Sequence, residues 1–144
     1  MLELEVLNVE IGAKYQGKIY DYWILGKLNS KKQIKIFDLF GYDLRNQINR
    51  KVECAIQPCI LYNETTKINL NKPYIKGIFV HKVFIPSNWI RCEKTVGESN
   101  WYGVQNEDGI FFIHVNDLQV LNLKKGDFIE FNVGRFDLLA WYNK

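Results

Sequence analysis

The sequence predicts an all-β fold, and three observations support this prediction. Hydrophobic side chains recur with a period of two, as in Ile129, Phe131 and Val133, which is the spacing of a strand with one buried face. The alternating runs end at turn-forming residues, and Asp108-Gly109 between two aromatic runs is the strongest hairpin signal. Helical spacing is scarce, and only residues 42–48 and 116–121 favour a helical turn or two.

We expect eight strands, each bounded by turn residues such as Gly41, Gly126 and Gly134. They cover residues 15–25, 33–40, 51–62, 75–86, 100–105, 110–115, 127–133 and 137–142. The early glycines Gly17 and Gly77 suit the sharp bend of a first barrel strand. The next strands follow from alternation, with Ile34 and Ile36 in one and with Val52, Cys54 and Ile56 in another.

The last four expected strands lie in the second half of the chain. Residues 100–105 and 110–115 flank the Asp108-Gly109 turn, and residues 127–133 follow the turn Lys125-Gly126-Asp127. Leu139-Ala140-Trp141 would close the barrel.

A polar stretch over residues 63–73 is the one plausible linker, and it divides the chain into residues 1–72 and 73–144. About 70 residues is the usual size of a five-stranded oligonucleotide/oligosaccharide-binding (OB) barrel. We therefore expect two small OB-like five-stranded barrels in tandem. One barrel with a long N-terminal extension is the alternative.

Charge does not by itself indicate a nucleic-acid partner, because the formal net charge of the 144 residues is only +3. The net positive charge lies in the first half. Residues 1–72 contain 11 Lys and Arg and 8 Asp and Glu, whereas residues 73–144 contain 8 of each kind. Aromatic residues are plentiful at 15%, and the hydrophobic fraction of 47% suffices for a core.

The chain lacks an apolar run of signal-peptide or membrane-spanning length, so we expect a cytoplasmic protein without a membrane partner. Three cysteines cannot all pair within one chain, which suits a reducing compartment. Cys54 and Cys59 are too far apart in sequence for a zinc knuckle, so we expect no metal and no cofactor. No nucleophile beside a base and no glycine-rich phosphate loop is evident, and we expect no enzymatic activity.

The segment Phe111–Val115 suggests a binding strand. Phe112 and His114 are two residues apart, so they share one face of a strand, while Phe111, Ile113 and Val115 would face the barrel interior. An exposed aromatic–histidine pair suits the stacking of unpaired bases. The same pair could instead form a protein interface.

Residues 76–142 resemble a cold-shock domain, a small barrel that binds single-stranded RNA and DNA. The resemblance rests on four segments in the family's order, which are Gly77–Val80, Trp101–Val104, Asp108–Leu118 and Leu123–Val133. It implies that Phe112, His114 and Tyr102 stack bases. Val104 and Asn100 stand where the family has a second stacking phenylalanine and a lysine.

Two further groups complete the expected site. Trp89 and Arg91 place an aromatic ring and a cation together in a loop, as a flanking contact. A basic hairpin would attract phosphates through Lys27, Lys31, Lys32 and Lys35, unless these lysines only protect edge strands from aggregation. The leading expectation is non-enzymatic binding of single-stranded RNA or DNA, and the alternative is a protein-interaction module, self-association included.

Overall fold

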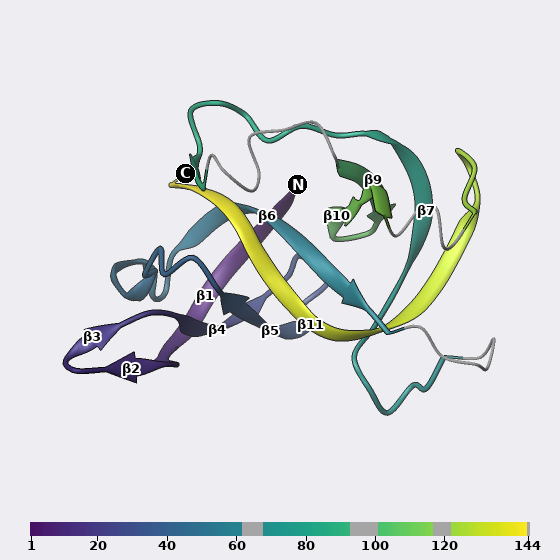
Figure 1. Cartoon of the computed structure of the whole chain (residues 1–144). Coiled ribbons are helices and arrows are strands. Elements are labelled where there is room, and N and C mark those ends of the chain that lie inside the picture. Colours follow the sequence, from purple (N-terminus) through teal and green to yellow (C-terminus); the bar gives the residue numbers. More distant parts are fainter. Residues whose placement is uncertain (62–67, 93–100, 117–121, 144) are drawn as a thin grey trace.

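The computed structural model describes residues 1–61, 68–92, 101–116 and 122–143, and it is an all-β structure, as the sequence predicts (Figure 1). One 3-10 helix, η1 (Arg45–Gln47), lies within the expected helical segment 42–48. The expected helical segment 116–121 lies almost entirely outside the described residues. The strands are β1 (Leu2–Ile11), β2 (Lys14–Tyr15), β3 (Lys18–Ile19), β4 (Tyr22–Lys27), β5 (Gln33–Asp38), β6 (Lys51–Ile60), β7 (Tyr74–Lys82), β8 (Ile90–Arg91), β9 (Trp101–Asn106), β10 (Gly109–His114) and β11 (Phe128–Asn143).

Five strand segments pair into a closed ring. β1 pairs with β4, β4 pairs with β5, and the C-terminal part of β11 pairs with both β5 and β6. The pairing of β6 with β1 closes the ring. The β5–β11 pairing is parallel, and the others in this ring are antiparallel.

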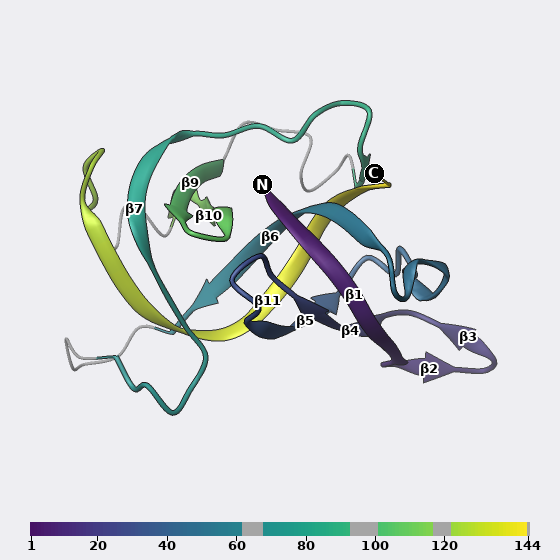
Figure 2. The same ribbon diagram turned by 180° about the vertical axis from the view of Figure 1, so that it is seen from behind.

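A second group of strands continues the same sheet. β9 lies between β7 and β10, and β7 pairs with the N-terminal part of β11. One pair, Leu2 with Gly109, joins β10 to β1. Figure 2 shows β1 passing in front of β6, with β9 and β10 beside them.

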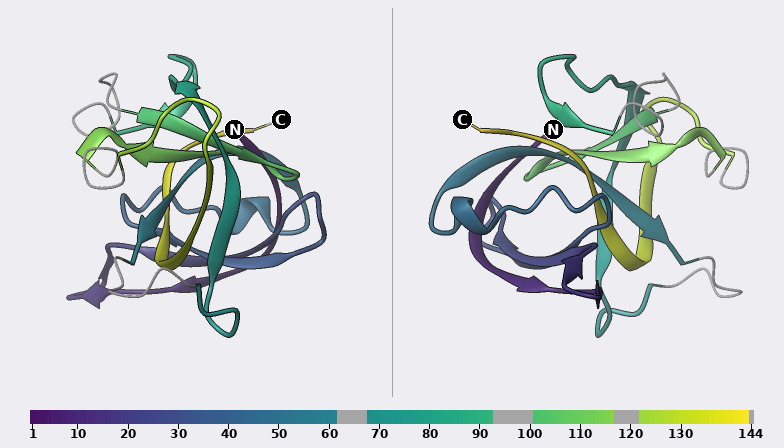
Figure 3. Two further views of the ribbon diagram at one scale, coloured as in Figure 1. Left: turned by 90° about the vertical axis from the view of Figure 1, so that its right-hand side faces the viewer. Right: turned by 60° about the vertical axis from the view of Figure 1, so that its left-hand side comes forward.

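The long strand β11 belongs to both groups and bends sharply between them (Figure 3). Its register with β6 shifts between Val133 and Arg135, around Gly134. Residues 128–132 pair with β7, and residues 133–143 pair with β6. Because pairing crosses the expected boundary between residues 72 and 73, the structure does not confirm two separate barrels in tandem.

Two buried clusters fill the structure. The larger one joins both halves of the chain, with Leu4 and Ile56 from the first half and Phe111 and Leu138 from the second. The smaller one lies on the other face of β10 and contains Trp101, Phe112 and Trp89. β10 is therefore buried on both faces.

Candidate nucleic-acid interface

The structure overturns the expected exposure of Phe112. Its side chain is 0% exposed, and it packs in the smaller cluster with Val83, Trp101 and Leu139. Phe112 is buried because other elements cover both faces of β10. Phe111 and Ile113, on the opposite face, are buried too. A buried ring offers no surface to a base, so Phe112 is a core residue.

The other two members of the expected stacking platform do not assemble with Phe112. His114 is half-buried and meets Trp101 edge to face, with ring centroids 5.2 Å apart. Tyr102 lies opposite Ile113 in the β9–β10 ladder, so its side chain is on the other face of the hairpin. There it stacks on Phe79 at 5.9 Å. The three residues do not share an exposed face.

Trp89 and Arg91 also have structural roles. Trp89 is buried in the smaller cluster and stacks on Tyr142, with ring centroids 6.1 Å apart. The Arg91 guanidinium donates a hydrogen bond to the Ile85 carbonyl at 3.2 Å. A buried Trp89 is not placed to make the flanking contact expected from the sequence.

The four expected lysines do lie together, on β4, β5 and the turn between them. Lys27 forms an ion pair with Glu5 at 3.9 Å. Lys31 is at the turn in the left-handed conformation, with φ of 72°, and its amide donates to the Leu28 carbonyl. Among the described residues, Lys31, Lys32 and Lys35 have no carboxylate within ion-pair distance. Three cations on this hairpin are thus available to an anionic partner.

Aromatic side chains lie beside these lysines on the outer face of the ring. Trp23 and Phe37 are directly opposite each other in the β4–β5 ladder, and their ring centroids are 4.7 Å apart. Both are half-buried, whereas their neighbours Ile24 and Ile36 point into the core and are fully buried. The alternation of β4 and β5 thus places this aromatic pair outward.

A cation covers each ring of the pair. The Lys35 ammonium lies 4.9 Å from the Trp23 ring centroid, and the Arg135 guanidinium lies 4.7 Å from that of Phe37. Arg135 also donates two hydrogen bonds to Asp137, at 2.6 and 3.0 Å, which raise the pKa of its guanidinium. We call Trp23, Lys35, Phe37 and Arg135 the cation–aromatic face.

A cavity of about 420 Å³ opens beside this face. Trp23, Lys32, Lys35 and Arg135 contribute to its lining, together with Gly134 where β11 bends. Three of the ten described lining residues are cations and none of the ten is acidic, so the cavity suits a ligand that combines negative charge with flat rings.

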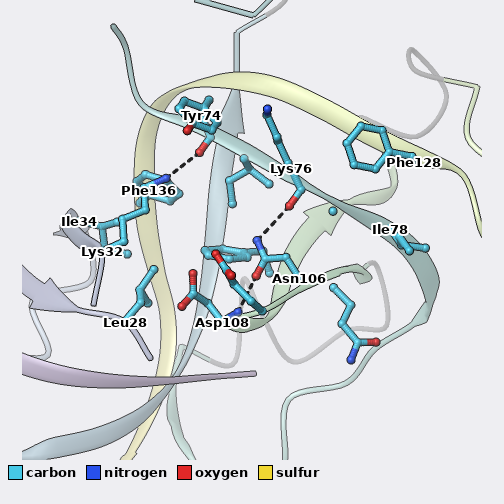
Figure 4. Close-up of a pocket in the computed structure, with 15 residues that line it drawn as sticks. Leu28, Lys32, Ile34, Tyr74, Lys76, Ile78, Asn106, Asp108, Phe128 and Phe136 are labelled. Atoms are coloured by element: carbon cyan, nitrogen blue, oxygen red, sulfur yellow. Dashed lines mark hydrogen bonds between the residues drawn. The ribbon is translucent and has the colours of Figure 1, made fainter. Parts of the chain in front are cut away.

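Lys32, Ile34 and Phe136 line both this cavity and a second one of about 480 Å³, shown in Figure 4. The Lys32 ammonium donates to the Tyr74 carbonyl at 3.2 Å and lies 4.6 Å from the Tyr74 ring centroid. Lys76 lies on the far side of Tyr74, 5.6 Å from the same ring, and pairs with Glu130 at 3.8 Å. The contact between Lys32 and Tyr74 therefore lies at the second cavity, and Tyr74 does not line the first one.

Sequence reasoning missed Phe37, Tyr74 and Arg135 as candidate site residues. Phe37 is two residues from Lys35 on the same strand, so both side chains lie on one face, and both alternate with buried isoleucines. This pattern could have identified Phe37 from the sequence. Tyr74 and Arg135 come from segments far along the chain from β4 and β5, and no local pattern places them there.

No family model, curated protein or solved structure matches this chain. Within the described ranges, no helix is long and apolar enough to cross a membrane. The same ranges hold no group of three or more His, Cys, Asp or Glu side chains placed to bind a metal ion.

Proposed function

We propose that this protein binds single-stranded RNA or DNA through the cation–aromatic face. The observation that carries the proposal is the outward pair Trp23 and Phe37, with Lys35 and Arg135 over their rings. Base–aromatic stacking contributes about 1–3 kcal/mol per base, and it tolerates any base because every base has a π-face. Lys31 and Lys32 extend the positive charge along the same hairpin.

The strand order of the ring supports this proposal by analogy of fold. The ring is similar to an OB barrel, whose second and third strands form the usual oligonucleotide-binding face. Counted around the ring, β4 and β5 hold these two places. The hairpin β2–β3 lies where such barrels have the loop between their first two strands, and it exposes Tyr15 and Tyr20.

A protein partner is the second candidate, and a separate observation favours it. Ile78 and Phe128 are directly opposite each other in the β7–β11 ladder and are 48% and 65% exposed. A neighbouring pair of exposed apolar side chains is typical of protein-interaction surfaces. This pair lines the second cavity and does not belong to the cation–aromatic face.

The test is a titration of the protein with a fluorescently labelled ten-thymidine strand at several salt concentrations. We expect Trp23→Ala and Lys35→Glu each to weaken binding about tenfold, because each removes a stacking or an ionic contact. Affinity of the wild type should also fall steeply as salt rises, since bound phosphates release counterions.

Phe84 and Lys82 supply matched controls, because they form a similar cation–aromatic contact at 5.9 Å outside both cavities. Phe84→Ala and Lys82→Glu should leave the affinity unchanged. Equal losses in the test and control variants would contradict the proposed face. A folded wild type without affinity at low salt would overturn the function.

A further inference from the structure

The second cavity contains a feature that phosphate attraction and stacking do not require, namely a buried carboxylate. Asp108 is 6% exposed and lines the cavity from the β9–β10 turn. Buried apolar side chains, Leu28, Phe111 and Phe136 among them, form the adjoining walls. Figure 4 shows the Asp108 carboxylate beside Leu28, across the cavity from Tyr74 and Lys76. We call this cavity the Asp108 pocket.

The carboxylate of Asp108 is only partly satisfied by the protein. One oxygen, Oδ1, accepts a hydrogen bond from the Ser30 amide at 2.8 Å. The other, Oδ2, accepts no hydrogen bond from any residue in the part of the chain that the structure describes. Oδ2 is not one of the fully buried polar atoms that lack a partner, so a ligand in the pocket that supplies N–H groups can reach it.

The shape and rim of the pocket restrict the kind of donor. Its volume of about 480 Å³ and its aromatic walls suit a flat ring system. Of the two lysines on the rim, Lys76 is paired with Glu130, whereas Lys32 has no carboxylate partner among the described residues and suits a phosphate attached to that ring. The ligand class is therefore a nucleotide whose base directs N–H donors at a carboxylate.

Among the common bases, guanine alone presents two adjacent donors, N1–H and the N2 amino group, on one edge. Uracil and thymine present one N–H between two carbonyl oxygens, which a carboxylate repels. Adenine and cytosine each present only an amino group. We propose that the Asp108 pocket binds a guanine base, with Asp108 accepting from N1–H and N2–H.

Where the guanine is part of a strand, this inference rests on the proposed function. A free guanine nucleotide presents the same edge, and the experiment therefore includes both sources. The strand arm compares ten thymidines with the same strand carrying one central guanosine. The nucleotide arm compares guanosine 5′-monophosphate with adenosine 5′-monophosphate.

We expect the wild type to bind the guanosine-containing strand about tenfold more tightly than the all-thymidine strand. Inosine, which lacks the N2 amino group, should remove most of this preference. 7-Deazaguanine keeps N1–H and N2–H and should preserve it. These comparisons use the wild-type protein and do not depend on the folding of a variant.

Asp108→Asn provides the matched variant, because the amide keeps one oxygen for Ser30 and replaces the other with a donor. It should lose the guanine preference and keep wild-type affinity for ten thymidines. Binding of both strands with equal affinity, without a preference for the guanine monophosphate, would overturn the inference and leave the proposed function standing. Failure to bind any strand would overturn the proposed function, and the pocket would then be judged on the monophosphates alone.

Discussion

At the scale of single residues, Phe112 and Phe37 are both strand phenylalanines, but Phe112 is a core residue and Phe37 lies on an outer face. Phe112 lies in the run Ile110–Ile113, which is apolar at every position, whereas Phe37 alternates with the buried Ile36 and Asp38. A continuous apolar run indicates a strand buried on both faces, while clean alternation indicates one exposed face. The apolar run around Phe112 thus favours the core, whereas the two-residue spacing of Phe112 and His114 alone predicts an exposed face.

The core position of Phe112 leads to a stability prediction. Phe112→Ala should lower the free energy of unfolding by about 3–5 kcal/mol, because it leaves a cavity among Val83, Trp101 and Leu139. Urea denaturation followed by circular dichroism measures this change.

His114→Ala is the control for that measurement, because His114 is only half-buried and should cost less than half as much. A Phe112→Ala protein of wild-type stability would contradict the placement of this ring.

At the scale of elements, most strands could be predicted from the sequence, and the exceptions have physical reasons. The expected hairpin is confirmed, because turn chemistry is local, although its turn residues are Glu107 and Asp108, and Gly109 begins β10. The first strand was missed, although Leu2, Leu4 and Val6 alternate with Glu3 and Glu5. The expected strands 127–133 and 137–142 are one strand, since Gly134 bends β11 without ending it.

Close packing of elements explains Gly77 and gives a second prediction. A Cβ added to Gly77 would lie 2.7 Å from the carbonyl oxygen of Gln105 and 2.7 Å from Val104 Cγ1, so β7 and β9 would have to separate. Gly77→Ala should therefore destabilise the protein by about 1–3 kcal/mol.

Gly134→Ala is the matched control. Its added Cβ would lie 3.0 Å from the flexible Leu61 side chain and 3.8 Å from the Cys59 carbonyl oxygen, an ordinary contact distance, so the loss of stability should be small. Thermal unfolding of both variants measures the difference, and equal melting temperatures would contradict the close β7–β9 approach.

At the scale of the whole molecule, the shared strand β11 makes the two halves interdependent. The ring formed by the first half contains β1, β4, β5 and β6 but closes only through residues 133–143 of β11. Local sequence patterns predict strands but not their partners. The pairing of β11 with β5 and β6, across the expected linker at residues 63–73, could therefore not be predicted. Lys31, Lys32 and Lys35 come from the more basic first half, whereas Arg135 of the cation–aromatic face comes from the second half.

This interdependence predicts that residues 1–72 alone do not fold. Without β11, the strands β5 and β6 expose unpaired edges, and the larger core cluster loses Phe136 and Leu138. We expect an amide NMR spectrum without dispersion for this fragment and a dispersed one for the full chain. A cooperative unfolding transition of residues 1–72 would instead support an independent first domain.

The four tryptophans allow a direct test of whether single strands bind at the cation–aromatic face. Trp23 is half-buried on this face, whereas Trp89, Trp101 and Trp141 are buried. The measurement is a titration of ¹⁵N-labelled protein with ten thymidines, in which the four indole N–H signals are assigned through Trp→Phe variants. We predict that the Trp23 signal shifts progressively and the other three stay in place. Shifts of the Trp89 or Trp101 signals with a stationary Trp23 signal would contradict the account.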